Sequence, residues 1–208
     1  MKYQLVLWDF DGTLADTLTL ALGIYNRMAE ENGYVKIDDP HSVRHMGMRD
    51  FLKSHNIPMY RIPLVFSAFL KELRSFAADI ELQEGVAILL GQISQLGIRQ
   101  GIVSSNSTDT IRTCLLANVA EAHFQYVSGT SGIFGKEKRI KTALRTLNVP
   151  TAQTLYVGDE IRDIEVAQAA GVDIAAVTWG LNTEEALSSR KPNHLISRPS
   201  DLLPILQK

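Results

Sequence analysis

Short apolar runs recur along the chain and alternate with longer segments in which apolar residues repeat every three or four positions. Several of the short runs lack the alternation of polar and apolar residues that a strand with one solvated face shows. This is typical of strands that are covered on both faces in a parallel sheet. We predict strands at residues 4–9, 99–105, 124–129, 154–159 and 173–179.

The segments between these runs have the spacing of amphipathic helices. Apolar side chains at helical spacing from Val86 to Leu96 precede Gly97, a residue type that is favoured where helices end. The same spacing recurs around Ile111–Leu115, Ile140–Leu147 and Ile164–Ala170. Strands and helices in repetition predict an α/β fold with a doubly wound, Rossmann-like parallel sheet.

Residues 16–83 break this rhythm, because only helical patterns occur there. An apolar stripe runs from Leu18 to Ala29, Pro40 suits the first turn of a second helix, and a longer pattern runs from Phe66 to Phe76. A small all-helical insertion directly after the first strand is the simplest explanation. We therefore expect an α/β core of residues 1–15 and 84–208 and a helical cap of residues 16–83.

Composition narrows the class of protein. Hydrophobic residues make up 45% of the 208 positions, and the net charge is −2 with no basic block. These values argue against disorder, and against nucleic acid or an anionic membrane as a partner. The chain has a single cysteine, Cys114, and shows no N-terminal signal and no apolar run of membrane-spanning length. We expect a cytoplasmic protein.

Acidic residues gather at the ends of two predicted strands. Asp9 and Asp11 follow the apolar run LVLW, and Asp159, Glu160 and Asp163 follow a later strand. Ligands of open parallel sheets bind beyond the carboxyl ends of the strands, so two acidic ends on one sheet edge predict a site for a hard divalent cation, Mg²⁺. For Glu160 and Asp163 an alternative stays open, because acidic side chains also stabilise helix N-termini.

Four segments of the chain resemble the four motifs of the haloacid dehalogenase superfamily, in the branch that contains phosphoglycolate phosphatase and β-phosphoglucomutase. The string DFDGTLADT at residues 9–17 resembles the first motif. The strings GIVSSN at 101–106, FGKEKRIKTAL at 134–144 and YVGDEIRDIEVAQAAG at 156–171 resemble the other three, in the same order. The likeness covers nearly the whole chain, with residues 16–83 in the place of the family's helical cap.

The resemblance implies a Mg²⁺-dependent phosphomonoester hydrolase. Asp9 would be the nucleophile that forms an aspartyl-phosphate, and Asp11 the general acid and base, with its main-chain carbonyl also on the metal. Asp159 would be a metal ligand, with Asp163 as a ligand or a support beside it. The chemistry itself needs such a cation, since a carboxylate and a phosphate dianion repel each other.

The second and third motifs would hold the phosphoryl oxygens. The resemblance assigns this role to Ser104 and Lys136, together with Thr13 of the first motif. Ser105 and Lys138 stay open as alternatives, because each lies close to the better match.

Two features separate the members of the family. True dehalogenases lack the second aspartate of the first motif, so Asp11 argues against that activity. Gly47 and Arg49 lie where this branch has its substrate-specificity loop, two positions apart here and three apart in the mutase pattern. This departure favours a phosphatase of a small phosphorylated metabolite, either phosphoglycolate-like or a sugar phosphate. The alternatives are a phosphomutase of the β-phosphoglucomutase type and a non-catalytic binding protein on the same scaffold.

Overall fold

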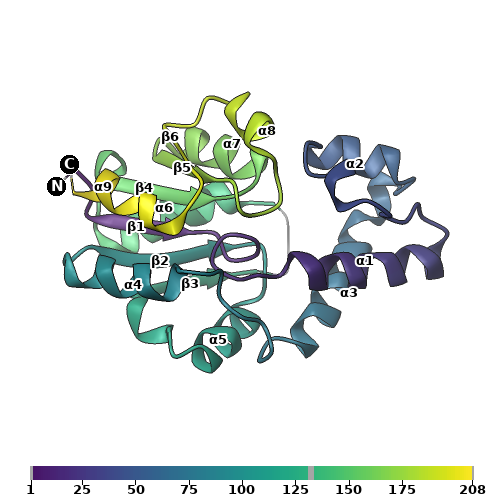
Figure 1. The fold of residues 1–208 in the computed structure, drawn as a ribbon, viewed down its shortest axis with the longest axis horizontal. Helices are drawn as coiled ribbons and strands as arrows, with labels where there is room; N and C mark the ends of the chain where they lie inside the picture. The colour runs from purple at the N-terminus through teal and green to yellow at the C-terminus, as the bar shows by residue number, and fades with distance from the viewer. Residues whose placement is uncertain (1, 131–133, 208) are drawn as a thin grey trace.

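A six-stranded sheet forms the centre of the protein (Figure 1). The computed structural model describes residues 2–130 and 134–207, and in this part of the chain every strand pair is parallel, in the order β3-β2-β1-β4-β5-β6. The strands are β1 (Leu5–Trp8), β2 (Arg99–Ser104), β3 (Tyr126–Gly129), β4 (Thr154–Gly158), β5 (Asp173–Val177) and β6 (His194–Ile196). The five predicted strands are confirmed. The sixth, β6, was not predicted, because three residues are too few to show a pattern.

The central strand β1 explains why the sequence shows no polar–apolar alternation. All four of its residues are buried, and successive side chains point to opposite faces of the sheet. Leu5 and Leu7 belong to one apolar cluster, whereas Val6 and Trp8 belong to another. Both faces of the sheet are therefore covered, as the prediction of a doubly wound fold requires.

Different helices supply the two apolar clusters. The cluster around Val6 and Trp8 contains side chains of α4 (Val86–Gln95), α5 (Thr108–Ala117) and α9 (Leu203–Leu206). The cluster around Leu5 and Leu7 contains side chains of α6 (Lys136–Leu147), α7 (Ile161–Ala170) and α8 (Glu184–Ser188). One-turn 3-10 helices are η1 (Pro40–Ser42), η2 (Met59–Arg61), η3 (Glu121–His123), η4 (Thr151–Gln153) and η5 (Pro199–Leu202). The predicted fold class is confirmed.

The chain between β1 and α4 forms a helical cap. It contains α1 (Leu18–Asn32), α2 (Met48–Ser54) and α3 (Ile62–Ser75), and Figure 1 shows these helices projecting beyond the ends of the strands. Pro40 does begin a turn, but that turn is a 3-10 helix of three residues. The longer helix that we expected after it begins only at Met48, where Gly47 is the N-cap residue.

The two segments that join cap and core run side by side. Ala15 forms an antiparallel bridge with Leu82, the amide of Asp16 donates to the carbonyl of Glu81 at 2.9 Å, and the amide of Gln83 donates to the carbonyl of Leu14 at 2.8 Å. These bonds fix the point at which the cap leaves the sheet. The exact division into residues 16–83 and the remainder stays a prediction.

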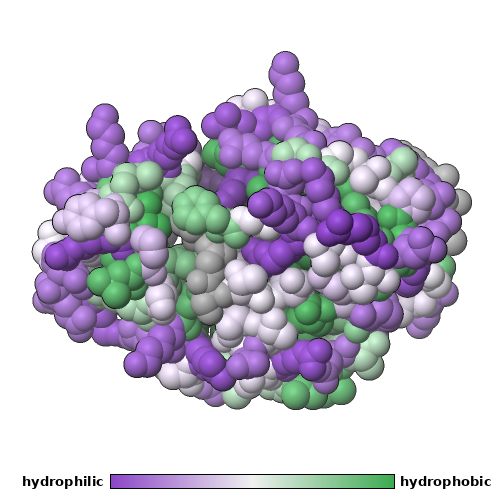
Figure 2. Space-filling view, turned by 180° about the vertical axis from the view of Figure 1, so that it is seen from behind, coloured by the Kyte–Doolittle hydropathy of each residue, from purple (hydrophilic) through white to green (hydrophobic). Residues whose placement is uncertain are grey.

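Among residues 2–130 and 134–207, no helix combines the length and the apolar character that crossing a bilayer requires. Figure 2 shows the face opposite to that of Figure 1, on which hydrophilic and hydrophobic residues are interspersed.

Gly129 at the end of β3 provides a test of this packing. A Cβ atom there would lie 2.4 Å from the carbonyl oxygen of Asn106 and 2.5 Å from the amide nitrogen of Thr108. We expect Gly129→Ala to lower the free energy of unfolding by about 1–3 kcal/mol, since the turn that follows β2 must move. Gly91→Ala is the control: it lies within α4 with no atom within 4 Å of the added Cβ, and should raise stability by about 0.5–1 kcal/mol.

Urea unfolding of both variants beside the unsubstituted protein measures the two effects. Equal stability of the Gly129→Ala variant and the original protein would contradict the close approach of β3 to this turn.

Candidate active site

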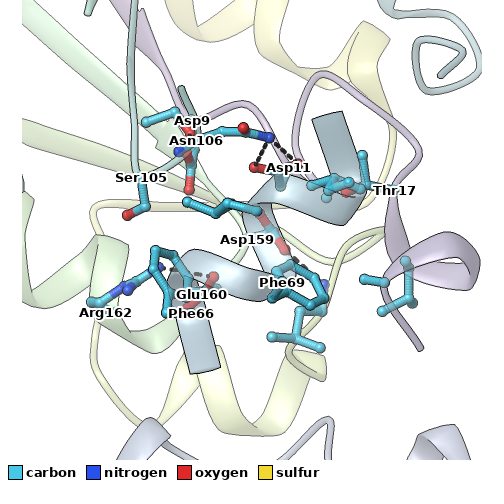
Figure 3. A pocket seen from close by; sticks show the side chains of 17 residues that line it. Asp9, Asp11, Thr17, Phe66, Phe69, Ser105, Asn106, Asp159, Glu160 and Arg162 are labelled. Atoms are coloured by element: carbon cyan, nitrogen blue, oxygen red, sulfur yellow. Dashed lines mark hydrogen bonds and ion pairs between the residues drawn. The ribbon is translucent and has the colours of Figure 1, made fainter. Parts of the chain in front are cut away.

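A pocket of about 180 Å³ lies between the carboxyl ends of the strands and the cap (Figure 3). Its lining comes from the loops after β1, β2 and β4 on the core side and from α1 and α3 on the cap side. We predicted that two strand ends with acidic residues share one edge of the sheet, and both of them lie at this pocket. The strand order accounts for this, because β1 lies between β2 and β4.

Asp9, the first residue after β1, is buried and held at both carboxylate oxygens. Its Oδ1 accepts a hydrogen bond from the amide of Phe10 at 2.7 Å, and its Oδ2 accepts from Nζ of Lys136 at 2.6 Å. Burial alone would raise the pKa of Asp9, but the charge and hydrogen bond of Lys136 outweigh burial and hold that pKa below its usual range. Asp9 is therefore an ionised, oriented carboxylate.

Lys136 is the lysine that reaches the acidic cluster. It begins α6, is almost completely buried, and donates from Nζ to Asp9 Oδ2 and to Asp163 Oδ1, the latter at 2.5 Å. Burial lowers its pKa, but the two carboxylates outweigh burial and raise it. Lys138 is exposed. The structure thus brings Lys136, and not Lys138, to the site.

Asp163 caps α7, as the alternative for this residue expected, and it also bonds to Lys136. Its Oδ1 accepts from Lys136, while its Oδ2 accepts from the amide of Glu160 at 3.1 Å, a capping bond at the start of α7. Burial raises its pKa to about 7, against the lowering effect of Lys136. The side chain of Asp163 therefore joins the N-terminus of α7 to the lysine.

Asp159 follows β4 and is also fully enclosed. Its Oδ1 accepts from the hydroxyl of Thr13 at 2.6 Å, and its Oδ2 accepts from the amide of Leu181 at 2.7 Å. Burial, and next the charge of Asp163, raise its pKa well above the usual value. Thr13 does not line the pocket, and its hydroxyl is engaged with Asp159. In this geometry the hydroxyl of Thr13 supports Asp159, and the phosphate contact expected for Thr13 stays a prediction.

Three glycines leave room for these carboxylates. A Cβ atom at Gly12 would lie 2.4 Å from Asp159 Oδ2, and one at Gly180 would lie 2.3 Å from the same atom. At Gly158 it would lie 2.5 Å from Asp163 Oδ2. The backbone thus approaches the carboxylates more closely than a side chain would permit.

Asp9, Asp159 and Asp163 form a group that fits a divalent cation. Each offers a carboxylate oxygen, and these atoms lie within 4.8 Å of one another. All the donors are hard oxygens, and burial and like charge already raise the pKa of Asp159, so a cation would offset an excess of negative charge. The carboxylate of Asp11, the fourth expected metal residue, is not part of this group in the described structure.

Asp11 lies two residues beyond Asp9 and lines the pocket. Both of its carboxylate oxygens accept from Nδ2 of Asn106 at 3.1 Å, as the dashed lines in Figure 3 show. Burial, and next the charge of Asp9, raise its pKa to about 7. The two aspartates of the first motif thus differ in protonation, because only Asp9 has a positive partner.

Ser104, the last residue of β2, and Ser105, directly after it, both line the pocket. The hydroxyl of Ser104 accepts from the amide of Asn106 at 3.1 Å, whereas the buried hydroxyl of Ser105 has no hydrogen-bond partner among the residues that the structure describes. The structure therefore brings Ser104 and Ser105 to the same place, and the choice between them as phosphate ligand stays open. Asn106, which the sequence reasoning missed, lies beside them.

The specificity residues expected in the cap lie elsewhere. Gly47 is the N-cap residue of α2, and Arg49 is exposed; neither lines the pocket. Two cap arginines contact the core: Arg74 of α3 pairs with Asp109 of α5 at 2.9 Å, and Arg44 reaches the loop after β5 beside the pocket. The Nε of Arg44 donates to the carbonyl of Leu181 at 3.0 Å, and its Nη2 donates to the carbonyl of Gly180 at 2.9 Å.

Asn182 connects the cap at Arg44 with the start of α7 beside the acidic residues. Its buried Nδ2 donates to the carbonyl of Arg44 at 2.7 Å, and its Oδ1 accepts from the amide of Ile161 at 2.8 Å, at the start of α7. The amide of Thr183 also donates to the carbonyl of Arg44, at 3.0 Å. The loop after β5 therefore bonds to the cap on one side and to Asp159 and α7 on the other.

Comparison with known proteins defines the family. Residues 6–177 match the haloacid dehalogenase-like hydrolase family, and the chain belongs to that family. The resemblance seen in the sequence is confirmed at this level.

Two curated relatives span nearly the whole chain. Phosphoglycolate phosphatase of Synechococcus elongatus is 32% identical over 202 residues, which are 96% of this chain and 95% of that protein. Pyrophosphatase PpaX of Bacillus mycoides is 26% identical over 227 residues, covering 100% of this chain and 99% of that protein.

Solved structures share the fold. A predicted phosphatase from Clostridium acetobutylicum aligns with a TM-score of 0.86 at 20% identity, covering 100% of both chains. CbbY from Rhodobacter sphaeroides, solved in complex with phosphate, aligns with a TM-score of 0.75 at 20% identity over 99% of this chain and 100% of that one. At such identities the likeness concerns the fold alone.

The buried lysine generates a stability prediction. Lys136→Met leaves Asp9 and Asp163 buried without their positive partner, so we expect the free energy of unfolding to fall by about 3–5 kcal/mol in EDTA. Lys138→Met, two residues further along the same helix and exposed, should change it by about 0.5 kcal/mol or less. Urea unfolding measures both, and an equal loss in the two variants would contradict the assignment.

The cap contact generates a second prediction. Arg44→Ala removes charged hydrogen bonds to the carbonyls of Leu181 and Gly180, so amide exchange at Leu181 and Thr183 should become roughly tenfold faster or more. Arg49→Ala is the matched control, since Arg49 is exposed and lines no part of the pocket. Hydrogen exchange resolved by residue is the measurement. Unchanged exchange in the Arg44 variant would show that this contact does not hold the loop.

Proposed function

We propose that this protein is a Mg²⁺-dependent phosphomonoester hydrolase that acts on a small phosphorylated metabolite through an aspartyl-phosphate intermediate. One observation carries the proposal. Asp9, ionised and fixed by Lys136, lies on the pocket together with Asp11, whose pKa of about 7 lets it give and take a proton near neutral pH. The names of the curated relatives, a phosphatase and a pyrophosphatase, agree with phosphorus chemistry.

In the first step, a carboxylate oxygen of Asp9 attacks the phosphorus atom. The new bond is an acyl-phosphate bond, the bond between phosphorus and the leaving oxygen breaks, and that oxygen takes the proton of Asp11. Lys136 and the amide of Phe10 hold the carboxylate of Asp9, so its approach needs little reorganisation. The Ser104–Asn106 segment, on the same core side of the pocket, supplies donors for the phosphoryl oxygens.

In the second step, Asp11 removes a proton from a water molecule, which attacks the same phosphorus atom. The acyl-phosphate bond breaks, inorganic phosphate leaves and Asp9 returns as a carboxylate. Asp11 thereby ends the cycle protonated, as it began. Asn106, which donates to both oxygens of Asp11, keeps this carboxyl group oriented through the two steps.

Asp9 and Asp159 would hold the Mg²⁺ ion, with Asp163 as a ligand or support and the main-chain carbonyl of Asp11 as the contact that the resemblance implies. When bound, the ion offsets the repulsion between a carboxylate and a phosphate dianion. Thr13 and the amide of Leu181 orient Asp159 for this purpose. Lys136 contributes by orienting Asp9 and Asp163, since its ammonium group donates to both.

Hydrolysis of p-nitrophenyl phosphate tests the proposal. Activity should need Mg²⁺, disappear in EDTA and return when Mg²⁺ is added. Asp9→Asn should lower kcat by about 10³-fold or more, because the nucleophile is lost, while Asp79→Asn, an exposed position on the cap, should leave kcat unchanged. Trapping of a phosphorylated enzyme in acid, absent from the Asp9 variant, identifies the intermediate.

Other outcomes would assign another function. Isomerisation of a sugar phosphate in the presence of an activating bisphosphate, with slow hydrolysis, would identify a phosphomutase. Binding of phosphate esters without turnover by a folded, Mg²⁺-loaded protein would identify a binding protein. Either result would overturn the proposed hydrolase.

A further inference from the structure

Buried side-chain groups without a hydrogen-bond partner gather around the end of β2. Among the residues that the structure describes, they are the hydroxyl of Ser105, Nε and Nη2 of Arg139, and Nε and Nη1 of Arg162. Arg139 reaches this place from α6, and its Nη1 donates to the carbonyl of Ser104. Burial lowers the pKa of Arg139 and the charge of Arg162 lowers it further, so the two guanidinium groups lie close enough to repel each other. Unpartnered buried donors are costly, and their concentration here indicates a place for an anion.

Arg162, the second residue of α7, is the cation of the described pocket lining. Its Nη2 lies 3.2 Å from Oε1 of Glu160, whereas its Nε and Nη1 have no partner among the described residues. Glu160 first, and then Asp163 and Asp9, raise the pKa of Arg162 against the effect of burial, so the guanidinium stays charged. The other ionisable groups of the described lining are acidic. They are Asp9, Asp11, Asp159 and Glu160.

Lys136, the cation that the resemblance assigned to the phosphoryl oxygens, is engaged elsewhere. Its Nζ donates to Asp9 at 2.6 Å and to Asp163 at 2.5 Å, and the residue is absent from the pocket lining. Two carboxylates therefore already balance its charge. Phosphoryl transfer depends on positive groups placed around the phosphoryl oxygens, and in the described lining Arg162 is the side chain that can supply one beside the metal ion.

The position of Arg162 favours contact with the phosphoryl group over contact with the leaving group. In the proposed mechanism Asp11 protonates the leaving oxygen, so the leaving group lies on the side of Asp11. Figure 3 shows Ser105 and Arg162 on one side of the pocket and Asp11 on the other. A donor at Arg162 therefore meets the oxygens of the phosphoryl group before it meets any group attached to the leaving oxygen.

The guanidinium group has donors to spare for a phosphoryl oxygen. In this structure its Nε and Nη1 are covered, so donation requires the group to turn about its own side-chain bonds. The turn gives up the bond from Nη2 to Glu160 and makes use of nitrogens that have no partner. A guanidinium fork matches two phosphate oxygens at once. The hydroxyl of Ser105, a residue only 7% exposed, is a further unpartnered donor on the same side.

We propose that Arg162 is a catalytic residue that binds the oxygens of the transferring phosphoryl group beside Ser105 and supplies the positive charge that Lys136 does not bring to the pocket. This inference rests on the proposed hydrolase function and adds a substrate-binding residue to it. Lys136 then orients the nucleophile, whereas Arg162 neutralises the group that the nucleophile attacks.

Binding of inorganic phosphate, the product, tests the inference without turnover. Calorimetric titration of the Mg²⁺-loaded protein should give a Kd for phosphate that is higher by roughly tenfold or more in Arg162→Gln than in the unsubstituted protein. Arg112→Gln, exposed on α5, is the control and should stay within about twofold. Equal affinities of the Arg162 variant and the unsubstituted protein would overturn the inference.

Two esters separate the phosphoryl group from the rest of the substrate. Methyl phosphate carries one anionic group, and phosphoglycolate adds a carboxylate. Arg162→Gln should lower kcat/KM by about 10²-fold for both esters, because both present the same phosphoryl group. A loss confined to phosphoglycolate would overturn the inference, since Arg162 would then bind the second acidic group.

The Mg²⁺ requirement separates phosphoryl binding from a structural role beside the metal site. The Mg²⁺ concentration for half-maximal activity should not rise in Arg162→Gln, because the substitution removes a cation and no metal ligand. A roughly tenfold rise with unchanged affinity for phosphate would show that Arg162 supports the metal site and would overturn the inference. If the folded, Mg²⁺-loaded protein hydrolysed neither ester, the proposed function would fall, whereas the phosphate titration judges Arg162 by itself.

Discussion

The burial of Lys136 between Asp9 and Asp163 is the interaction on which the rest of the site depends. An ammonium group enclosed in protein is stable only beside negative charge, and two buried carboxylates are stable only beside positive charge. The end of β1 and the starts of α6 and α7 must therefore converge to within hydrogen-bond distance. This need fixes the relative positions of three segments that are far apart in the sequence. Among the described residues, it leaves the carboxyl groups of Asp11 and Asp159 without an ion-pair partner.

Much of the fold and of the acidic site could be predicted from the sequence, because the patterns that identify strands and their ends are local. Buried strands without alternation identified a parallel sheet, and the carboxyl ends of such strands share one edge, so Asp9 and Asp159 could be brought together without coordinates. The spacing could not choose between Lys136 and Lys138, since the choice depends on which face of α6 packs on the sheet. It also could not show that the hydroxyl of Thr13 is taken up by Asp159.

The sequence predicted the cap as a helical insertion, but it could not predict which side chains of the cap face the pocket. Helical spacing located α1 and α3, but the pocket side of each helix depends on how the cap is seated on the core. Arg44 and Asn182 set that seating, and they are far apart in sequence and belong to no local pattern. The resemblance pointed to Gly47 and Arg49 instead, whereas the lining holds apolar residues of α1 and α3. The acidic strand ends could therefore be located from the sequence, whereas the cap side of the pocket could not.

Asn182 couples the position of the cap to that of α7. One amide group holds the main chain of the cap at Arg44 and the first turn of α7 at Ile161, so the cap cannot lift without releasing a bond that steadies the floor of the site. The seating of the cap and the position of α7, the helix that carries Asp163, are thereby linked through a single side chain.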